Sequence, residues 1–115
     1  MKTNLTHIKI GVSNIEKSLK WYTEILGFEV DSCYPEKNPV YYDFKGIGAC
    51  FAIGLAENGK IYNGGRINFE IEEVDRLWEQ LKNKVTVIEP IYDTPWGTRK
   101  FTIADPDGNE LGFCK

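Results

Sequence analysis

The one histidine of the chain, His7, opens a short run in which polar and apolar residues alternate. His7 and Lys9 alternate with Ile8 and Ile10. Because successive side chains of a strand point to opposite faces of a sheet, the two polar residues share one face. An imidazole can bind a metal ion or move a proton, and an ammonium group can hold an anion. The run therefore predicts a strand with a polar face that is able to bind a ligand.

Two later runs have the same alternation. Arg66, Asn68 and Glu70 alternate with Ile67, Phe69 and Ile71, and Glu110 shares a face with Gly112 and Cys114, opposite Leu111 and Phe113. Guanidinium, amide and carboxylate groups bind polar ligands, and carboxylates also ligate metals. With one histidine and no serine or cysteine elbow motif, the sequence supplies no nucleophilic triad. The chemistry that it does predict is recognition by polar strand faces.

The strands that carry these residues belong to an internal repeat with an offset of 59 residues, which aligns residues 8–17 with residues 67–76. In both copies an alternating run changes to helical spacing at the same point. Ser13 and Glu16 have the form of a capping box, and Gly27 supplies a helix stop. Two apolar stripes then predict helices: Ile15, Leu19, Tyr22 and Leu26 in the first copy, and Val74, Leu77, Trp78 and Leu81 in the second.

Each predicted helix is followed by three strand-like segments: 28–33, 40–44 and 49–53 in the first copy, and 85–89, 99–104 and 110–114 in the second. Turn-forming residues predict a linker over about 57–65 and a tight turn at 105–109. The expected fold is a single α+β domain of two βαβββ modules, about 4–56 and 66–115. We expect curved mixed sheets around a cleft, with the helices on the outer face.

The polar faces allow two interpretations. They line a cleft between two curved sheets, or they form an ordinary solvated surface. In the cleft interpretation, aromatic side chains from other segments join them, and Tyr41, Phe51 and Trp96 would offer flat surfaces for a planar or cationic ligand. Trp96, between Pro95 and Gly97, would lie on a loop at the rim of the cleft or pack into the core.

Composition narrows the class of partner. The 115 residues carry a net charge of −3, and no basic stripe is present, so the chain is not expected to bind nucleic acid. No 18-residue apolar stretch or secretion signal occurs, which predicts a cytoplasmic protein without a membrane span. Three cysteines at distant positions predict reduced thiols, each a small buried apolar residue: Cys33, Cys50 and Cys114.

The chain resembles the vicinal-oxygen-chelate superfamily, which contains glyoxalase I, extradiol dioxygenases and the bleomycin and fosfomycin resistance proteins. The resemblance spans nearly the whole chain. It rests on the segments HIKIGVSN (7–14), WYTEILGF (21–28), PWG (95–97) and DPDGN (105–109). It implies paired βαβββ modules, a concave ligand site and a homodimer.

The enzymes of this superfamily hold a divalent metal such as Zn, Ni, Mn or Fe. The resemblance places their ligands on a histidine of the first strand, a histidine or glutamate of the first strand of the second module, and a glutamate of the last strand. Here His7 matches the first position, but the second is Arg66 and the third is Gly112. Glu70 and Glu110 are the available substitutes. With one match of three, no metal cofactor is expected.

The leading hypothesis is therefore a metal-independent small-molecule binding protein, similar to the bleomycin-resistance proteins. Its expected ligand-binding residues are His7, Lys9, Tyr41, Phe51, Arg66, Asn68, Glu70, Trp96 and Glu110. The first alternative is a metal-dependent lyase, isomerase or dioxygenase of the same superfamily, in which a glutamate would move protons. The second is a structural or regulatory module whose cleft binds a protein partner. Whether the protein is an enzyme stays open at this stage.

Overall fold

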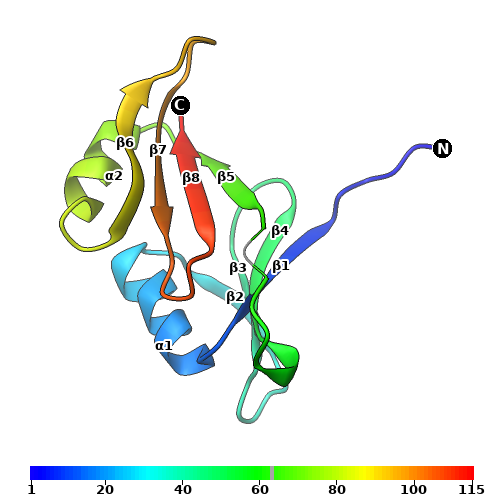
Figure 1. Cartoon of the computed structure of the whole chain (residues 1–115). Coiled ribbons are helices and arrows are strands. Elements are labelled where there is room, and N and C mark those ends of the chain that lie inside the picture. The colour runs from blue at the N-terminus through cyan, green and yellow to red at the C-terminus, as the bar shows by residue number, and fades with distance from the viewer. Residues whose placement is uncertain (63) are drawn as a thin grey trace. The chain divides into compact units, whose positions relative to one another are not determined.

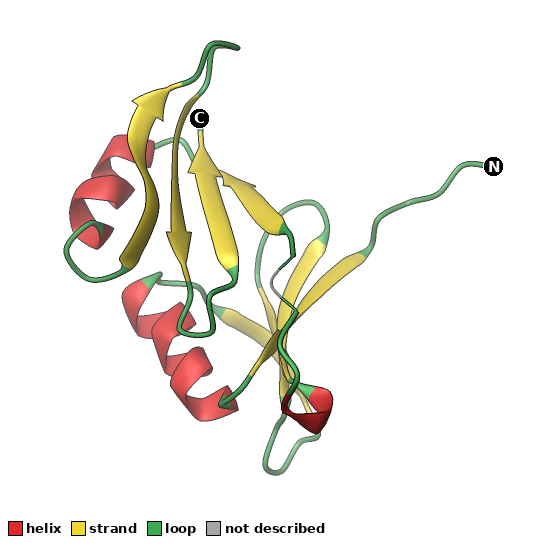
Figure 2. Ribbon diagram, viewed as in Figure 1, coloured by secondary structure: helices red, strands yellow, loops and turns green. Residues whose placement is uncertain are grey.

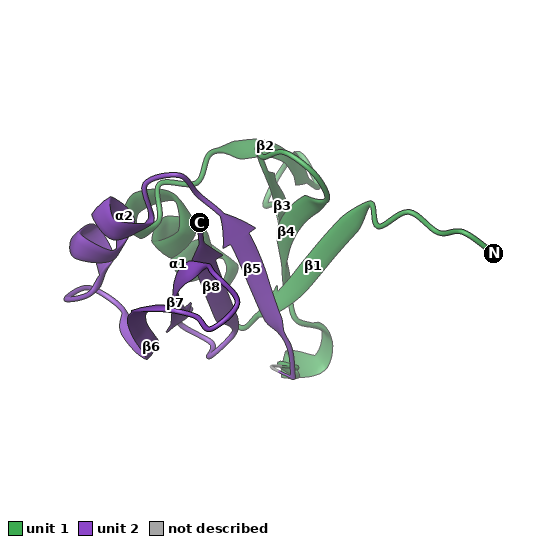
Figure 3. Cartoon of the chain, turned by 90° about the horizontal axis from the view of Figure 1, so that it is seen from above, with its two compact units in different colours: residues 1–62 green, residues 63–115 purple. Residues whose placement is uncertain are grey.

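The alternating run at the start of the chain forms strand β1, His7–Val12, in the computed structural model (Figure 1), which describes residues 1–62 and 64–115. The chain divides into two compact units, 1–62 and 63–115 (Figure 3). In the first unit, β1 is followed by helix α1, Ile15–Lys20, by a π-helical stretch, Trp21–Ile25, and by strands β2 Val30–Tyr34, β3 Tyr41–Phe44 and β4 Cys50–Leu55. A short turn of 3₁₀-helix, Glu57–Gly59, follows β4.

The second unit repeats this order. It contains strand β5, Arg66–Glu70, helix α2, Val74–Leu81, and strands β6 Thr86–Asp93, β7 Arg99–Ala104 and β8 Glu110–Cys114. The two four-stranded sheets have equivalent strand orders, β1-β4-β3-β2 and β5-β8-β7-β6. In each sheet the first pair is parallel and the others are antiparallel. The predicted α+β class, with two βαβββ modules, is confirmed.

Each helix covers one face of the sheet in its own unit: α1 packs on β4 and α2 packs on β7 (Figure 2). In the first unit, the fully buried Tyr22 ring lies 5.5 Å from Phe44 and 5.7 Å from Phe51 between ring centroids. In the second unit, Phe101 is fully buried, 5.3 Å from both Trp78 and Phe113. The helical stripes predicted from the sequence therefore supply each core, as expected.

The first helix begins one residue later than the capping box predicts. Asn14, in an extended conformation, is the N-cap, and its Oδ1 accepts a hydrogen bond of 3.0 Å from the backbone N–H of Lys17. Asparagine is as good a cap as serine, so the cap moves with the helix start. The predicted stop at Gly27 is confirmed. This residue has a φ of 76°, in the left-handed region that glycine adopts at little cost.

Strand β6 is longer than the predicted segment 85–89, since it continues to Asp93. Its pairing with β7 shifts register between Val87 and Glu89 and again between Glu89 and Tyr92. The second shift spans Pro90, which has no N–H to donate to a ladder and is tolerated at such irregularities. Strand β6 therefore continues beyond Pro90, whereas the predicted segment stops at residue 89. No helix among the described residues is long and apolar enough to span a membrane.

Candidate functional site

The first unit gathers an imidazole, a carboxylate and a thiol on the sheet face opposite α1. His7 of β1 is the register partner of Cys50 of β4, and Asp43 lies on the next strand, β3. The potential metal-binding atoms of these three residues all lie within 4.8 Å of one another. His7 is exposed, whereas Asp43 and Cys50 are half-buried. We call these three residues the first-unit cluster.

Hydrogen bonds hold the Asp43 carboxylate in place. Its Oδ1 accepts from the Tyr41 hydroxyl at 2.8 Å and from the Cys50 thiol at 3.6 Å, and its Oδ2 accepts from the Ser32 hydroxyl at 2.9 Å. Because these donors come from β2, β3 and β4, the carboxylate is fixed by three neighbouring strands. The hydrogen bonds from the sheet therefore restrict the Asp43 side chain to one orientation.

These contacts shift the proton affinities of the group. Burial acts to raise the pKa of Asp43, but hydrogen bonds from Tyr41, Ser32 and Cys50 and the nearby His7 outweigh it, so that this pKa lies below its usual value. Burial and the hydrogen bond to Asp43 raise the pKa of Tyr41 to about 12. Burial and the negative charge of Asp43 also raise the pKa of the Cys50 thiol. At neutral pH, Asp43 is thus the charged member and its two partners keep their protons.

The second unit carries an ion-pair network on its polar face. The Arg66 guanidinium donates from Nε and Nη2 to one oxygen of Glu110, at 3.0 and 2.8 Å, and from Nη1 to Glu89 at 2.7 Å. The Thr102 hydroxyl also donates to Glu89, at 2.7 Å. The residues come from β5, β6, β7 and β8, so this network crosses the whole sheet. Each of the three ionised side chains is about one-third exposed, at 30–34%.

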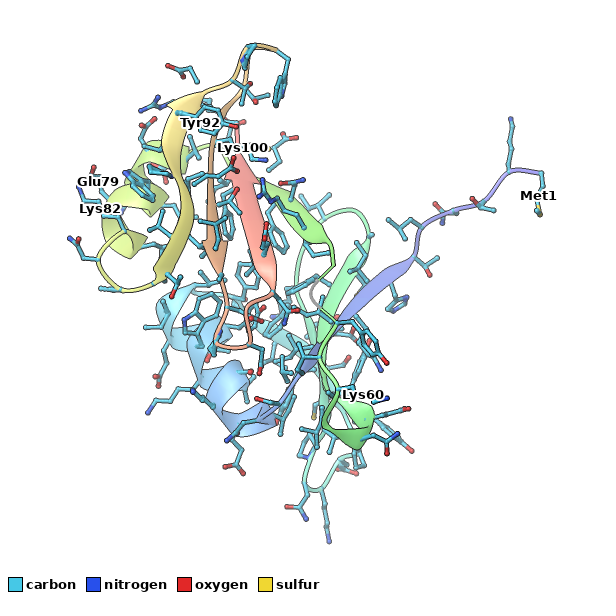
Figure 4. The ribbon with its side chains drawn as sticks, viewed as in Figure 1. Met1, Lys60, Glu79, Lys82, Tyr92 and Lys100 are labelled. Carbon is cyan, nitrogen blue, oxygen red and sulfur yellow. The ribbon has the colours of Figure 1, made fainter. Side chains whose placement is uncertain are left out.

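The network changes the pKa of two of its members. The Thr102 hydrogen bond is the largest influence on Glu89; together with Arg66 and Lys100 it overcomes burial, and the pKa of Glu89 falls below its usual value. The hydrogen bond to Glu110 raises the pKa of Arg66 further above its already high value. Lys100 is the register partner of Tyr92 on the neighbouring strand (Figure 4). Both shifts favour the charged forms, as expected for a paired network.

A glycine of the last strand lies beneath a polar side chain in each unit. A Cβ added to Gly54 would lie 3.0 Å from Cδ of Lys9, and one added to Gly112 would collide with Oδ1 of Asn68. Lys9 and Asn68 are equivalent positions of the repeat, separated by its offset of 59. The absent side chains let Lys9 and Asn68 lie flat across the sheets. At Gly112 this space is filled by the asparagine.

The structure brings some of the predicted ligand-binding residues together and separates others. Tyr41 joins the first-unit cluster through Asp43, and Arg66 and Glu110 share one network. Glu70 is exposed at the far end of β5, and Trp96 is 71% exposed on the loop between β6 and β7. Phe51 lies in the core, 7% exposed, and not on the polar face. Its neighbour Cys50 faces the His7 side, so alternation turns Phe51 toward the helix.

Several residues of both groups were not anticipated from the sequence: Ser32, Asp43, Cys50, Glu89 and Thr102. The expectation that each thiol is buried is wrong. Cys33 is exposed and Cys50 and Cys114 are half-buried, and all three are free. Cys50 and Cys114 lie on the polar faces, and Cys33 lies on β2, where every residue is exposed. The sequence did contain a signal for the first-unit cluster: in β3, Tyr41 and Asp43 lie two residues apart and so share one face of the strand, whereas Phe44 lies on the other face.

A surface hollow of about 260 Å³ lies elsewhere, beside α2 of the second unit. It is lined by Ile71, Glu73, Arg76, Leu77 and Gln80. None of these residues belongs to the first-unit cluster or to the Arg66 network. The outer side of the same helix carries the exposed Glu79–Lys82 ion pair, at 2.8 Å (Figure 4).

The lowered pKa of Glu89 predicts how the network responds to acid. A carboxyl whose folded-state pKa is depressed stabilises the fold above its unfolded pKa, and this contribution is lost as the pH falls through the folded pKa. Glu89→Gln should lower the free energy of unfolding by about 1 kcal/mol at pH ~7, since the charged hydrogen bonds are partly exposed. Urea unfolding should show this gap closing as the pH falls from about 5 to about 3.

Glu79→Gln is the matched control for Glu89→Gln, because Glu79 is an exposed carboxylate paired with Lys82 on α2. It should change the free energy of unfolding by less than about 0.5 kcal/mol at either pH. A gap between wild type and Glu89→Gln that stays constant with pH would show that the charge of Glu89 does not carry the effect.

Residues 4–113 match the family described as the Glyoxalase/Bleomycin resistance protein/Dioxygenase superfamily. A curated protein of Bacillus sp. (strain MD1), a trivalent organoarsenical cleaving enzyme, is 27% identical in an alignment of 115 positions that covers 93% of this chain and 70% of that protein.

Solved structures share the same fold over nearly the full chain. A superfamily member from Sphaerobacter thermophilus DSM 20745 is 28% identical, with a TM-score of 0.77 and coverage of 98% of this chain and 97% of that one. TnmS3, an antibiotic-binding protein from Streptomyces sp. CB03234, is 24% identical, with a TM-score of 0.78 and coverage of 97% and 94%. TioX from Micromonospora sp. ML1 has a TM-score of 0.80 at 16% identity, and the alignment covers 98% of each chain.

Proposed function

The chain belongs to the Glyoxalase/Bleomycin resistance protein/Dioxygenase superfamily, and from this premise we propose that it binds a small organic molecule without using a metal at the ligand positions of the family's enzymes. The proposed ligand carries a flat ring and at least one charged or hydrogen-bonding group. Arg66, Asn68, Glu70 and Glu110 would contact it on the second unit, with Trp96 as an aromatic surface. On the first unit, His7, Lys9 and Tyr41 would form a separate polar face able to contact a ligand.

One observation carries this proposal: Arg66, which the family resemblance assigns to the second metal-ligand position, is held in a network with Glu89 and Glu110. A guanidinium has no lone pair to offer a metal ion. It also holds an oxygen of Glu110 through two hydrogen bonds, which would have to break before this substitute carboxylate could ligate. At the third position, Gly112 supplies no side chain, and Asn68 covers it. The two positions on this unit are therefore built for hydrogen bonding.

The same network leaves groups available to a ligand. Arg66 has five N–H groups, and three make the hydrogen bonds described above. The other N–H groups of this half-buried side chain can donate to a carboxylate or carbonyl oxygen of a ligand, as charge-assisted hydrogen bonds. Glu70 lies on the same face and is exposed, so it can accept from a basic group. The antibiotic-binding relative supports a role in binding, although its ligand is a property of that protein.

Cleavage of organoarsenicals, the reaction named for the curated relative, is not the function that the geometry favours. A soft metalloid centre calls for thiolate ligands close together. In the first unit, Cys50 faces His7 and Asp43, whereas Cys33 pairs with Tyr42 on the opposite side of the sheet. Cys114 belongs to the second unit and donates to the Phe69 carbonyl at 3.7 Å. The thiols of the first unit therefore do not converge.

The proposal is tested by calorimetric titration of chelator-treated protein with planar aromatic antibiotics, basic and acidic, and with small carboxylic acids. At least one class should bind. Arg66→Gln should weaken binding of an anionic ligand about tenfold or more, and should strengthen binding of a cationic one because Glu89 and Glu110 lose their shared cation. Circular dichroism checks that the variant is folded.

Arg76→Gln is the matched control for Arg66→Gln. Arg76 is 69% exposed on α2 and pairs with Glu73, so its loss changes the net charge equally but leaves the polar face intact. Binding that appears only after a divalent metal is added would reverse the proposal in favour of a metalloenzyme. Equal affinities in Arg66→Gln and Arg76→Gln would remove Arg66 from the binding surface. The homodimer remains a prediction, which light scattering would check.

A further inference from the structure

We infer that the first-unit cluster, His7, Asp43 and Cys50, is a binding site for a borderline-soft divalent metal ion of the Zn²⁺ class. The site shares His7 with the ligand positions of the family's enzymes, but its other two ligands, Asp43 and Cys50, belong to the same module and do not lie at those positions. It needs neither Arg66 nor Gly112. It also goes beyond the proposed function, since small-molecule binding on the polar faces does not require it.

The spacing of the three donors fits a tetrahedral ion. Zinc lies about 2.0–2.3 Å from nitrogen, oxygen and sulfur ligands, so donor atoms around one ion are separated by about 3.3–3.8 Å in tetrahedral geometry. The donors of the cluster already lie within 4.8 Å of one another without an ion. To reach tetrahedral spacing, each donor atom would have to move by about 1 Å or less. A side-chain rotation of the exposed His7 can supply such a movement.

The strands fix the three side chains on one face. His7 and Cys50 are direct register partners on the parallel pair β1 and β4, and Asp43 comes from β3 on the other side of β4. Sites built on strands hold their ligands more precisely than sites built on loops. Three protein ligands leave a fourth position open, which is the arrangement of zinc sites that bind an exchangeable ligand.

The donor types select the class of ion. An imidazole nitrogen, a thiolate sulfur and a carboxylate oxygen together suit Zn²⁺ and related transition metals. Mg²⁺ and Ca²⁺ prefer oxygen ligands alone, so they would not use the cysteine. The thiol proton, which is donated to Asp43 in the metal-free protein, would leave when the sulfur binds the ion.

Outer hydrogen bonds support the assignment independently. The Tyr41 and Ser32 hydroxyls both donate to the Asp43 carboxylate, one to each oxygen. Carboxylates that ligate metals are themselves held by hydrogen bonds of this kind, which orient them and are costly to remove. Each carboxylate oxygen accepts through more than one lone pair, so Asp43 can keep these partners and bind an ion. Tyr41 is therefore a positioning residue.

The test is titration of chelator-treated full-length protein with Co²⁺, a spectroscopic substitute for Zn²⁺. Wild type should bind one equivalent and show a thiolate-to-cobalt charge-transfer band in the near ultraviolet, which Zn²⁺ then displaces. Cys50→Ser should abolish the band, and Asp43→Asn should weaken binding about 10–100-fold or more. Tyr41→Phe should weaken it about tenfold while the band remains. Circular dichroism confirms that each variant is folded.

Cys33→Ser is the matched control, because this thiol lies on the opposite face of the same sheet and its loss should leave the titration unchanged. Absence of the band in folded wild type would overturn the inference and leave a hydrogen-bonded polar group. A band that survives Cys50→Ser but not Cys33→Ser would also overturn it. Repeating the small-molecule titrations on metal-free protein separates the two claims, because binding there supports the proposed function whatever the cobalt result.

Discussion

Replacing Phe101 by alanine should lower the free energy of unfolding by about 3–5 kcal/mol. The ring is fully buried on β7, with its centroid 5.3 Å from both Trp78 of α2 and Phe113 of β8. Truncation removes the contact between helix and sheet and leaves a cavity that these large rings cannot fill without moving. Urea unfolding followed by circular dichroism measures the change.

Trp96→Ala is the comparison for Phe101→Ala, because it removes an aromatic ring that is 71% exposed on a loop of the same unit. It should change the free energy of unfolding by less than about 0.5 kcal/mol. If Phe101→Ala lowers the free energy of unfolding by no more than Trp96→Ala does, the packing of α2 on β7 contributes little to stability. Because Trp96 is also a proposed ligand contact, the same variant serves in the binding titrations.

The second large effect is expected at the turn between β7 and β8. Asp105 is 5% exposed, and its Oδ1 accepts from the backbone N–H groups of Asp107 and Asn109, at 2.9 and 2.8 Å. Its Oδ2 accepts from Nδ2 of Asn109 at 2.9 Å. Asp105→Ala leaves these donors without the carboxylate and should lower the free energy of unfolding by about 2–3 kcal/mol. Urea unfolding is again the measurement.

Asp105→Asn is the matched variant, because its amide oxygen can still accept from both backbone N–H groups. It should lower the free energy of unfolding by only about 1 kcal/mol, through the lost charge and the contact with Asn109. Equal losses in the two variants would show that the backbone hydrogen bonds are not what stabilises the turn.

The fold was largely accessible from the sequence because each module repeats the same patterns. The stripe of Val74, Leu77, Trp78 and Leu81 gives α2 directly, and the predicted turn at 105–109 is held by Asp105. The predicted ends of elements were wrong where two neighbouring positions are almost equally favourable as the end. Asn14 replaces Ser13 as the cap, and β6 continues past Pro90.

The candidate site was less accessible because its members meet across strands. Alternation within β1 and β5 places His7 and Arg66 on polar faces, but it does not say which side chains of other strands lie beside them. His7 and Asp43 lie on either side of Cys50 only because β4 lies between β1 and β3 in the sheet. Glu89 reaches Arg66 from β6, a strand whose register shifts on either side of that residue. Strand order and irregular register follow from the folded sheet, not from periodicity.

The glycine beneath Asn68 bears on which substitutions could introduce a metal site in the second unit. Gly112→Glu, the step toward a last-strand metal ligand, would force a Cβ into Oδ1 of Asn68. Arg66→His, the step toward the other ligand, would deprive Glu89 and Glu110 of the guanidinium that they share. The two changes affect different partners, because the first requires the exposed Asn68 side chain to turn away and the second leaves two glutamates without their shared cation. A metal site at these two positions would therefore require several coordinated substitutions in this chain rather than one.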